Sequence, residues 1–221
     1  MAELNFKIDK SRDLENIWET ATSSSRWYDF KQHVSQNIVK MCEGKNFEEC
    51  EIELDKLMSH IYKTGLLEIY IDALQKAWNL INGRYFNRME KIFNKKFPFE
   101  NVNVYLTTSG RCPYDPDEPS FMVSFFYSIP GSLSVCGHEL MHIFFHNTYW
   151  NDVAKEIGED KTADLKEALT VLLNLEFSDL WITPDEGYES HQELRNFIVE
   201  KWSEEKDFEK LLSKCIKYLK D

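Results

Sequence analysis

Apolar side chains recur at three- and four-residue spacing through most of the first hundred residues, a periodicity typical of helices that pack on one face. Gly44, Gly65 and Gly83 interrupt this periodicity and predict breaks between the helices. Pro98 then closes the helical region. The pattern predicts helices over residues 26–41, 47–63, 66–80 and 84–97.

The pattern changes after residue 100. Val102, Val104 and Leu106 alternate with polar or smaller residues, which predicts a strand. A stretch rich in turn residues follows, and then residues 121–128, whose aromatic and β-favouring side chains predict a second strand. Helical periodicity returns over residues 132–146, 161–177 and 190–219.

Helices, then short strands, then more helices predict an α+β fold that is mostly helical, with a small sheet preceding the helix at residues 132–146. We expect residues 1–99 to form a helical N-terminal region and residues 100–221 a second unit, either separately or as one continuous domain.

Composition and charge narrow the class of protein. With 221 residues, 43% of them hydrophobic and 29% charged, the chain can bury a sizeable core. A formal charge of −12 argues against nucleic acid as a partner, because a phosphate backbone is bound through dense Lys and Arg. The five cysteines are scattered without a C-x-x-C pair, and we find neither a signal peptide nor a stretch of membrane-spanning length. We therefore expect a reduced, cytoplasmic protein that does not bind membranes.

The chemistry of the chain is concentrated at His138-Glu139-Leu140-Met141-His142. On a helix, two histidines four residues apart lie on one face, so their imidazoles can converge on one ion, and neutral imidazole suits zinc. Glu139 adjoins the first ligand and is placed to take a proton from water on the open side of the metal. The motif thus predicts two zinc ligands and a general base.

A catalytic zinc site needs a third protein ligand. His146 is the nearest candidate, but along a continuous helix it lies about 12 Å from His138, too far to share an ion. We interpret His146 as a helix C-terminal residue, where the helix dipole favours it. On the next predicted helix, Glu167 lies among apolar residues, and a carboxylate there is costly unless it is paired or coordinated. We predict Glu167 as the third ligand, with Asp164 as the alternative.

With these residues, the chain resembles the gluzincin group of zinc metallopeptidases, the thermolysin-like enzymes, which carry H-E-x-x-H on one helix and a glutamate ligand on a later helix. The resemblance covers residues 101–177 and rests on His138, Glu139, His142 and Glu167. It implies a minimal zincin-like catalytic unit, a bound Zn²⁺ and a peptide or protein substrate.

The chain also departs from the gluzincin pattern. These enzymes commonly have an aspartate four residues after the ligand glutamate, where it orients a ligand histidine, but this chain has Val171 there. Asp164 or Asn174 is then expected to orient the histidine. The resemblance further implies a strand beside the cleft that pairs with extended substrate. Residues 121–128 are either that strand or an ordinary core strand.

A peptidase of this group also needs a donor that faces the developing oxyanion. His191 lies where Ser190 and Glu193 predict a capping box, and an imidazole near a helix N-terminus tends to stay neutral and can donate. Tyr188 is a second candidate, and either residue could instead lie in a surface turn. His33 and His60 have no partner that the sequence identifies.

These observations predict a zinc-dependent hydrolase that cleaves peptide bonds, with His138, His142 and Glu167 as ligands, Glu139 as base and His191 as donor. One alternative is a catalytically silent, zinc-stabilised scaffold that binds a partner through its N-terminal helices. Another is a zinc hydrolase of non-peptide substrates, which would use the same residues.

Overall fold

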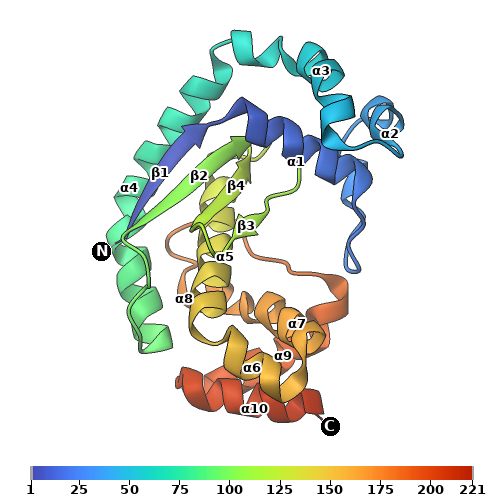
Figure 1. Ribbon diagram of the computed structural model, residues 1–221. Coiled ribbons are helices and arrows are strands. Elements are labelled where there is room, and N and C mark those ends of the chain that lie inside the picture. The colour runs from blue at the N-terminus through green and yellow to red at the C-terminus, as the bar shows by residue number, and fades with distance from the viewer. Residues whose placement is uncertain (1, 221) are drawn as a thin grey trace.

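A four-stranded mixed sheet forms the upper part of the protein in the computed structural model, which describes residues 2–220 (Figure 1). The strand order is β1-β2-β4-β3, with β1 parallel to β2, β2 parallel to β4, and β3 antiparallel to β4. The strands are β1 (Glu3–Ile8), β2 (Asn101–Thr107), β3 (Tyr114–Asp115) and β4 (Ser120–Ser124). The predicted α+β fold, mostly helical with a small sheet before the motif helix, is confirmed.

The first strand lies within residues 1–99, the part of the chain predicted as a helical N-terminal region. β1 pairs with β2 along its whole length, from Glu3 beside Asn101 to Ile8 beside Leu106. At only six residues, β1 contains too little alternation to be recognised locally, and its strand form depends on a partner almost a hundred residues away. The sheet therefore contains strands from both predicted parts of the chain.

The helices before residue 100 also differ in extent from the prediction. The segment predicted as one helix over residues 26–41 instead holds a short 3₁₀ turn and a short helix, because Asp29 and Ser35 each cap a new turn with their side chains. Gly83 causes no break, because tertiary packing of the long helix outweighs the propensity of one glycine. The elements are α1 (Lys10–Thr22), η1 (Phe30–His33), α2 (Gln36–Cys42), α3 (Phe47–Met58), η2 (Ile61–Lys63) and α4 (Leu66–Phe93).

Two hydrophobic cores hold these elements together. The main core joins the sheet to α4 and to the helices after residue 128. A smaller core lies among the first three helices, which we call the α1–α3 lobe. Its buried members are Leu14, Ile17, Ala21, Ile38, Cys42, Cys50 and Leu54.

β4 overlaps the strand predicted over residues 121–128 and lies inside the sheet. Of the two alternatives given for that segment, the structure agrees with an ordinary core strand. β4 is hydrogen-bonded to β2 on one side and to β3 on the other. The short β3 instead forms the edge of the sheet beside β4, and β1 forms the other edge.

The C-terminal half is helical, with more breaks than predicted. The predicted helices over residues 161–177 and 190–219 are each divided in two, at Thr170 and at residues 205–207, and a further helix starts at Trp150. None of the helices within residues 2–220 is long and apolar enough to cross a membrane. The elements are α5 (Ile129–Thr148), α6 (Trp150–Ile157), α7 (Glu159–Leu169), α8 (Val171–Glu176), η3 (Glu189–His191), α9 (Gln192–Glu204) and α10 (Phe208–Lys220).

Candidate metal centre

The motif helix α5 begins three residues before its prediction, because Ser128 caps it and accepts a hydrogen bond from Gly131 N–H (3.2 Å). Pro130 suits the first turn, where its missing N–H costs nothing. The helix continues to Thr148, so the H-E-x-x-H motif lies in its middle, away from frayed ends. His138 and His142 therefore project from one face, with ring centroids 4.2 Å apart.

The residue before the motif fixes the position of α5 in the core. Tyr85 of α4 donates a hydrogen bond from its hydroxyl to the carbonyl of Gly137 (2.6 Å). A side chain at Gly137 would meet the ring of Trp181 at 2.6 Å, so only glycine allows this close packing. The motif helix is thus held from behind by two buried aromatic side chains.

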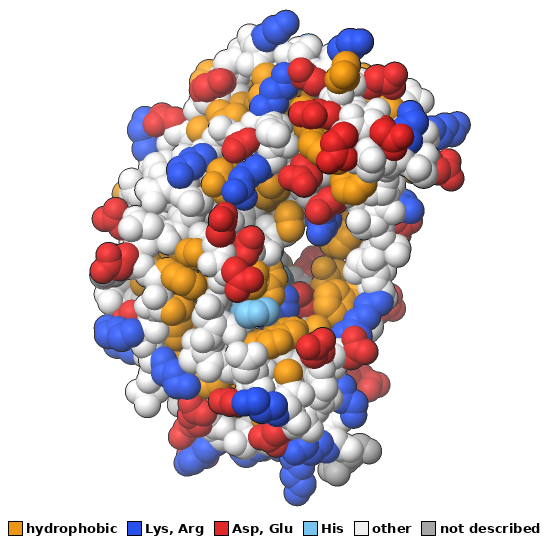
Figure 2. Space-filling model, in the orientation of Figure 1, with side chains coloured by type: hydrophobic (Ala, Val, Ile, Leu, Met, Phe, Trp, Pro, Cys, Tyr) orange, Lys and Arg blue, Asp and Glu red, His pale blue; other side chains and the backbone are white. Residues whose placement is uncertain are grey.

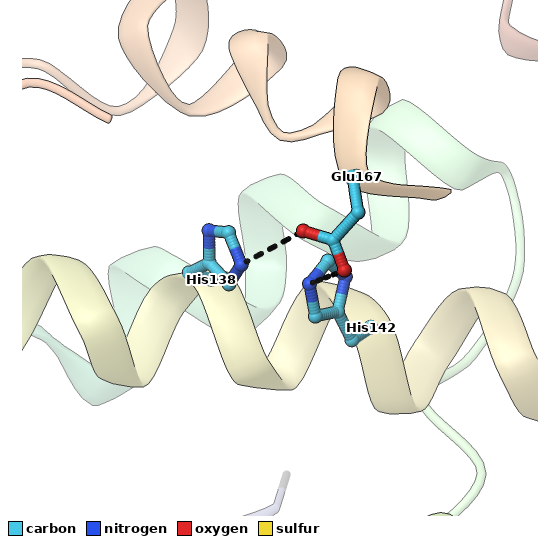
Figure 3. A group of neighbouring side chains, drawn as sticks. All are labelled: His138, His142 and Glu167. Carbon is cyan, nitrogen blue, oxygen red and sulfur yellow. Dashed lines mark ion pairs between the residues drawn. The ribbon is translucent and has the colours of Figure 1, made fainter. Parts of the chain in front are cut away.

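Glu167 reaches the two histidines from α7, as Figure 3 shows. Its Oε1 lies 3.3 Å from His142 Nε2, and its Oε2 lies 3.7 Å from His138 Nε2. α7 ends two residues later, where the hydroxyl of Thr170 donates to the carbonyl of Glu167 (2.7 Å) and competes with continued helical bonding. The structure therefore brings together the three residues predicted as ligands.

The donor set fits a zinc ion. One ligand atom from each of the three residues lies within 4.8 Å of the other two, and zinc bound tetrahedrally at about 2.0–2.1 Å holds its ligand atoms roughly 3.4 Å apart. Two imidazoles and one carboxylate are a known set for catalytic zinc. Nδ1 of His142 is buried without a hydrogen-bond partner among the described residues. The other ring nitrogen, Nε2, is the one that faces Glu167.

Asp185 orients His138, a role that the sequence analysis considered for Asp164 or Asn174. Its Oδ2 lies 2.6 Å from Nδ1 of His138, and its Oδ1 accepts from Arg195 Nη1 (2.9 Å). Asn174 holds Asp185 in turn: its side chain accepts from the backbone N–H of Asp185 and donates to the carbonyl of Asp185, both at 2.7 Å. Asp185 lies on an irregular segment 47 residues from His138, so no local spacing could reveal it.

Buried carboxylates favour positive charge at the cluster. Burial opposes protonation of His138, but Asp185, Glu139 and Glu167 outweigh burial and raise the pKa of His138 to about 9. Burial lowers the pKa of His142 to about 3, which keeps this imidazole neutral, as metal binding requires. Burial also acts to raise the pKa of Glu167, yet His142, Lys166 and His138 hold it well below its usual range.

Lys166 is a cation in the site that the sequence analysis did not identify. It is 6% exposed, its Nζ lies 2.8 Å from Glu167 Oε1, and it lies over the ring of Tyr114, 4.5 Å from the centroid. A lysine beside a carboxylate in a helix looks like an ordinary surface pair, and only the packing against β3 buries it. The ion pair with Lys166 therefore holds Oε1 of Glu167, the predicted ligand, in place.

Two adjoining cavities, which we together call the cleft, open over the motif. The first, about 320 Å³, is lined by His138, Glu139, His142 and Glu167 together. The second, about 480 Å³, adjoins it at His138 and Glu139. Burial raises the pKa of Glu139 to about 7. Figure 2 shows the molecule hollowed near its centre, with hydrophobic side chains beside the opening.

The two predicted donors occupy different positions. Tyr188 lines both cavities. His191 is 4% exposed, lies outside both linings, and directs Nε2 to Oδ1 of Asp164 (3.1 Å). Asp164, the alternative third ligand, accepts from His191, from Trp27 Nε1 (2.9 Å) and from Arg26 Nη2 (2.8 Å). The structure therefore places Tyr188 beside the motif and joins His191 to Asp164.

The remaining histidines lie outside the cluster. His146 is in the last turn of α5, as predicted, and stacks on Trp150 with a centroid distance of 4.8 Å. His33 contacts the hydroxyl of Tyr28 (3.0 Å), and His60 directs Nδ1 to the carbonyl of Leu57 (2.9 Å).

Comparison of the chain with family models, with curated proteins and with solved structures finds no match. The case for a function therefore rests on the residues and geometry of the site.

Proposed function

We propose that the protein is a zinc-dependent hydrolase that cleaves peptide bonds. The observation that supports this most is the first cavity, onto which His138, Glu139, His142 and Glu167 all open. A structural zinc site is closed by four protein ligands, whereas a catalytic one keeps an open position. Three converging donors that face a cavity favour catalysis over the zinc-stabilised scaffold.

Each side chain has a role that follows from its position. Zinc, when bound, supplies Lewis acidity to a carbonyl group and to water. Glu139 adjoins the ligands without belonging to the three-residue cluster, so its carboxylate is free to take a proton from water and pass it to the leaving amine. Tyr188 supplies the hydroxyl donor for the developing oxyanion in this proposal, in place of His191, whose Nε2 is engaged by Asp164.

The edge strand supports a peptide as the substrate. Met122 N–H donates to the carbonyl of Pro113 (2.9 Å), and neighbouring residues in an antiparallel pair alternate in direction. The backbone groups of Tyr114 therefore face away from β4, and Tyr114 lines the first cavity. An extended peptide can add to such an edge through main-chain hydrogen bonds, which a non-peptide substrate does not exploit.

Glu139→Gln tests the proposal. The substitution keeps the size of the side chain and removes its basicity, so hydrolysis of a peptide library should fall by about 10²–10⁴. Zinc content and thermal stability should stay near those of the wild type, because Glu139 is not one of the three ligands. The matched control is Glu193→Gln, an exposed carboxylate in the first turn of α9, which should retain full activity.

Zinc analysis of the purified wild type comes first. A protein without stoichiometric zinc, or one whose peptide hydrolysis is the same in the wild type and in Glu139→Gln, would sink the proposal. Cytoplasmic location, a peptide or protein partner, and the absence of nucleic-acid and membrane partners stay predictions from the sequence.

A further inference from the structure

The segment between α1 and α2 lines the cleft. We call residues 23–33 the strap. It descends from the end of α1 towards the irregular segment before α9 and then returns to α2 (Figure 1). Ser23, Ser24, Ser25, Trp27 and Phe30 line the first cavity together with the H-E-x-x-H motif, although about a hundred residues separate them in the chain. The strap therefore forms part of the wall of the proposed catalytic cavity.

The first anchor of the strap is on α7. Arg26 Nη2 and Trp27 Nε1 both donate to Oδ1 of Asp164, at 2.8 and 2.9 Å, and Arg26 Nη1 also donates to Asp160 Oδ1 (2.8 Å). The ring of Trp27 stacks on the ring of Tyr188, with centroids 5.5 Å apart and planes at 27°. Two neighbouring strap residues thus hold α7 and the proposed oxyanion donor at once.

The second anchor is on the opposite wall, where the chain enters the edge strand. The side chain of His33 packs against Gly110 so closely that a Cβ on Gly110 would lie 2.7 Å from His33 Cβ. Between the two anchors, Phe30 lines both cavities. The strap therefore bridges the α7 wall and the β3 wall, with Phe30 between them.

We propose that the strap is a substrate-selecting bridge over the cleft, latched by Arg26 and Trp27 on Asp164. While it is latched, an unstructured peptide segment can thread beneath it, but a folded protein surface cannot reach Glu139. The substrate class is then unfolded or short peptide chains. This part rests on the proposed function, whereas the latch itself does not.

The latch is suited to open. Its anchoring side chains are partly exposed, at 41% for Arg26 and 33% for Asp164. One oxygen of Asp164 accepts from both Arg26 and Trp27, while Arg26 also donates to the side chain and the carbonyl of Asp160. Loss of that single oxygen removes the polar contacts of Trp27 with α7 and one of those of Arg26. A region with few buried apolar contacts opens locally at low cost in free energy.

Cys112 provides a reporter for opening. It lines both cavities beneath the strap and is partly exposed, whereas Cys42, Cys50, Cys136 and Cys215 are buried. A bulky maleimide attached to a polymer should reach Cys112 only when the strap opens. A small thiol reagent should enter the cleft in either state, so it controls for the intrinsic reactivity of the thiol.

The test compares Asp164→Ala with Glu159→Ala, at the start of the same helix. The Asp164 substitution should speed labelling by the bulky maleimide about tenfold or more, because losing a hydrogen bond to a charged group shifts an opening equilibrium by at least that factor. The Glu159 side chain is exposed and, unlike that of Asp160, makes no hydrogen bond or ion pair with the strap among the described residues, so its substitution should have little effect. Labelling by the small reagent should change little in either variant.

Trp27→Ala, on the partly exposed strap, repeats the test without altering α7, and Cys112→Ser should abolish the labelling. Equal bulky-reagent rates in the wild type, Asp164→Ala and Trp27→Ala would overturn the latch. These readouts need neither metal nor activity, so they remain decisive if the protein cleaves nothing.

Substrate selection is measured on one cleavable sequence, presented as a free peptide and as a loop of a folded protein. Opening the latch should raise the folded-to-free ratio of kcat/KM about tenfold or more, in step with the labelling rate. An unchanged ratio despite faster labelling would show that the strap opens without selecting substrates. Failure of the wild type to cleave the free peptide would count against both the proposed function and this selection role. The labelling rates would still decide whether Asp164 latches the strap.

Discussion

The metal centre and the α1–α3 lobe with its strap contribute to the same cleft but are built in opposite ways. At the metal centre, two of the three candidate ligands have a second contact, His138 with Asp185 and Glu167 with Lys166, and α5, which carries both histidines, is held by Tyr85. Glu167, Lys166 and Tyr85 are buried, and the side chains of His138 and Asp185 are 21% and 8% exposed. The lobe has a small core of its own, and its strap joins α7 through two partly exposed residues.

This difference separates two requirements of the proposed chemistry. Metal ligands and a general base must be held to within a fraction of an ångström, which needs side chains locked by packing and by further hydrogen bonds. Admission of a substrate needs a part that moves, and such parts come from the less stable regions of a protein. The rigid half thus carries the reacting groups, and the loosely attached half controls access to them.

Removal of a ligand should have the largest effect on the metal centre. His138→Ala, His142→Ala and Glu167→Ala should each abolish stoichiometric zinc binding in equilibrium dialysis, because two remaining donors do not hold the ion tightly. Asp164→Ala should bind zinc like the wild type, since its carboxylate serves the strap. If Asp164→Ala lost zinc binding and Glu167→Ala kept it, the ligand set would be refuted.

Loss of an orienting contact should have an intermediate effect. Asp185→Asn keeps the volume of the side chain but removes the charge that holds His138, and changes of such partners typically weaken metal binding 10–100-fold. The change in zinc affinity would be measured by competition with a chelator of known affinity. Asp179→Asn is the matched control, because that exposed carboxylate pairs with Arg88 on the surface. Equal affinities in both variants would show that packing alone positions His138.

Damage to the lobe should affect the metal centre least. Leu54→Ala removes a fully buried side chain from the small core and should destabilise α1–α3 by about 2–5 kcal/mol, seen as faster hydrogen exchange in those helices. Zinc affinity should stay within about twofold of wild type, since binding responds only to changes that differ between the metal-free and metal-bound states. Leu57→Ala, on the same helix but 42% exposed, should alter neither. A parallel fall in zinc affinity would mean that the two regions unfold as one unit.

Helix α5 shows how far local pattern reaches. The four-residue spacing of His138 and His142 determines that they share a face, because helix geometry depends only on neighbours in the chain. The same reasoning correctly excluded His146 from the cluster. Glu167 was predicted from its apolar surroundings and from the resemblance to gluzincins, and the fold brings its carboxylate against both imidazoles.

The errors occurred where distant contacts decide the outcome. β1 is a strand because it pairs with β2. α4 continues through Gly83 because residues of the helix before and after this glycine are packed in the main core. Residues 121–128 were predicted either as a strand bordering the cleft or as a core strand, and only the pairing of β4 with both β2 and β3 decides for an interior strand. None of these pairings leaves a periodicity in the chain.

The sequence by itself determined the mostly helical α+β class, the motif helix and the residue types at the cluster, since these follow from short-range spacing and side-chain chemistry. Only the tertiary structure decided that Asp185 orients His138, that Tyr188 lines the cleft while His191 binds Asp164, and that the strap lines the same cavity as Glu139. Those arrangements join residues tens to more than a hundred positions apart. Their energies arise from burial and hydrogen bonds that exist only once the main core has formed.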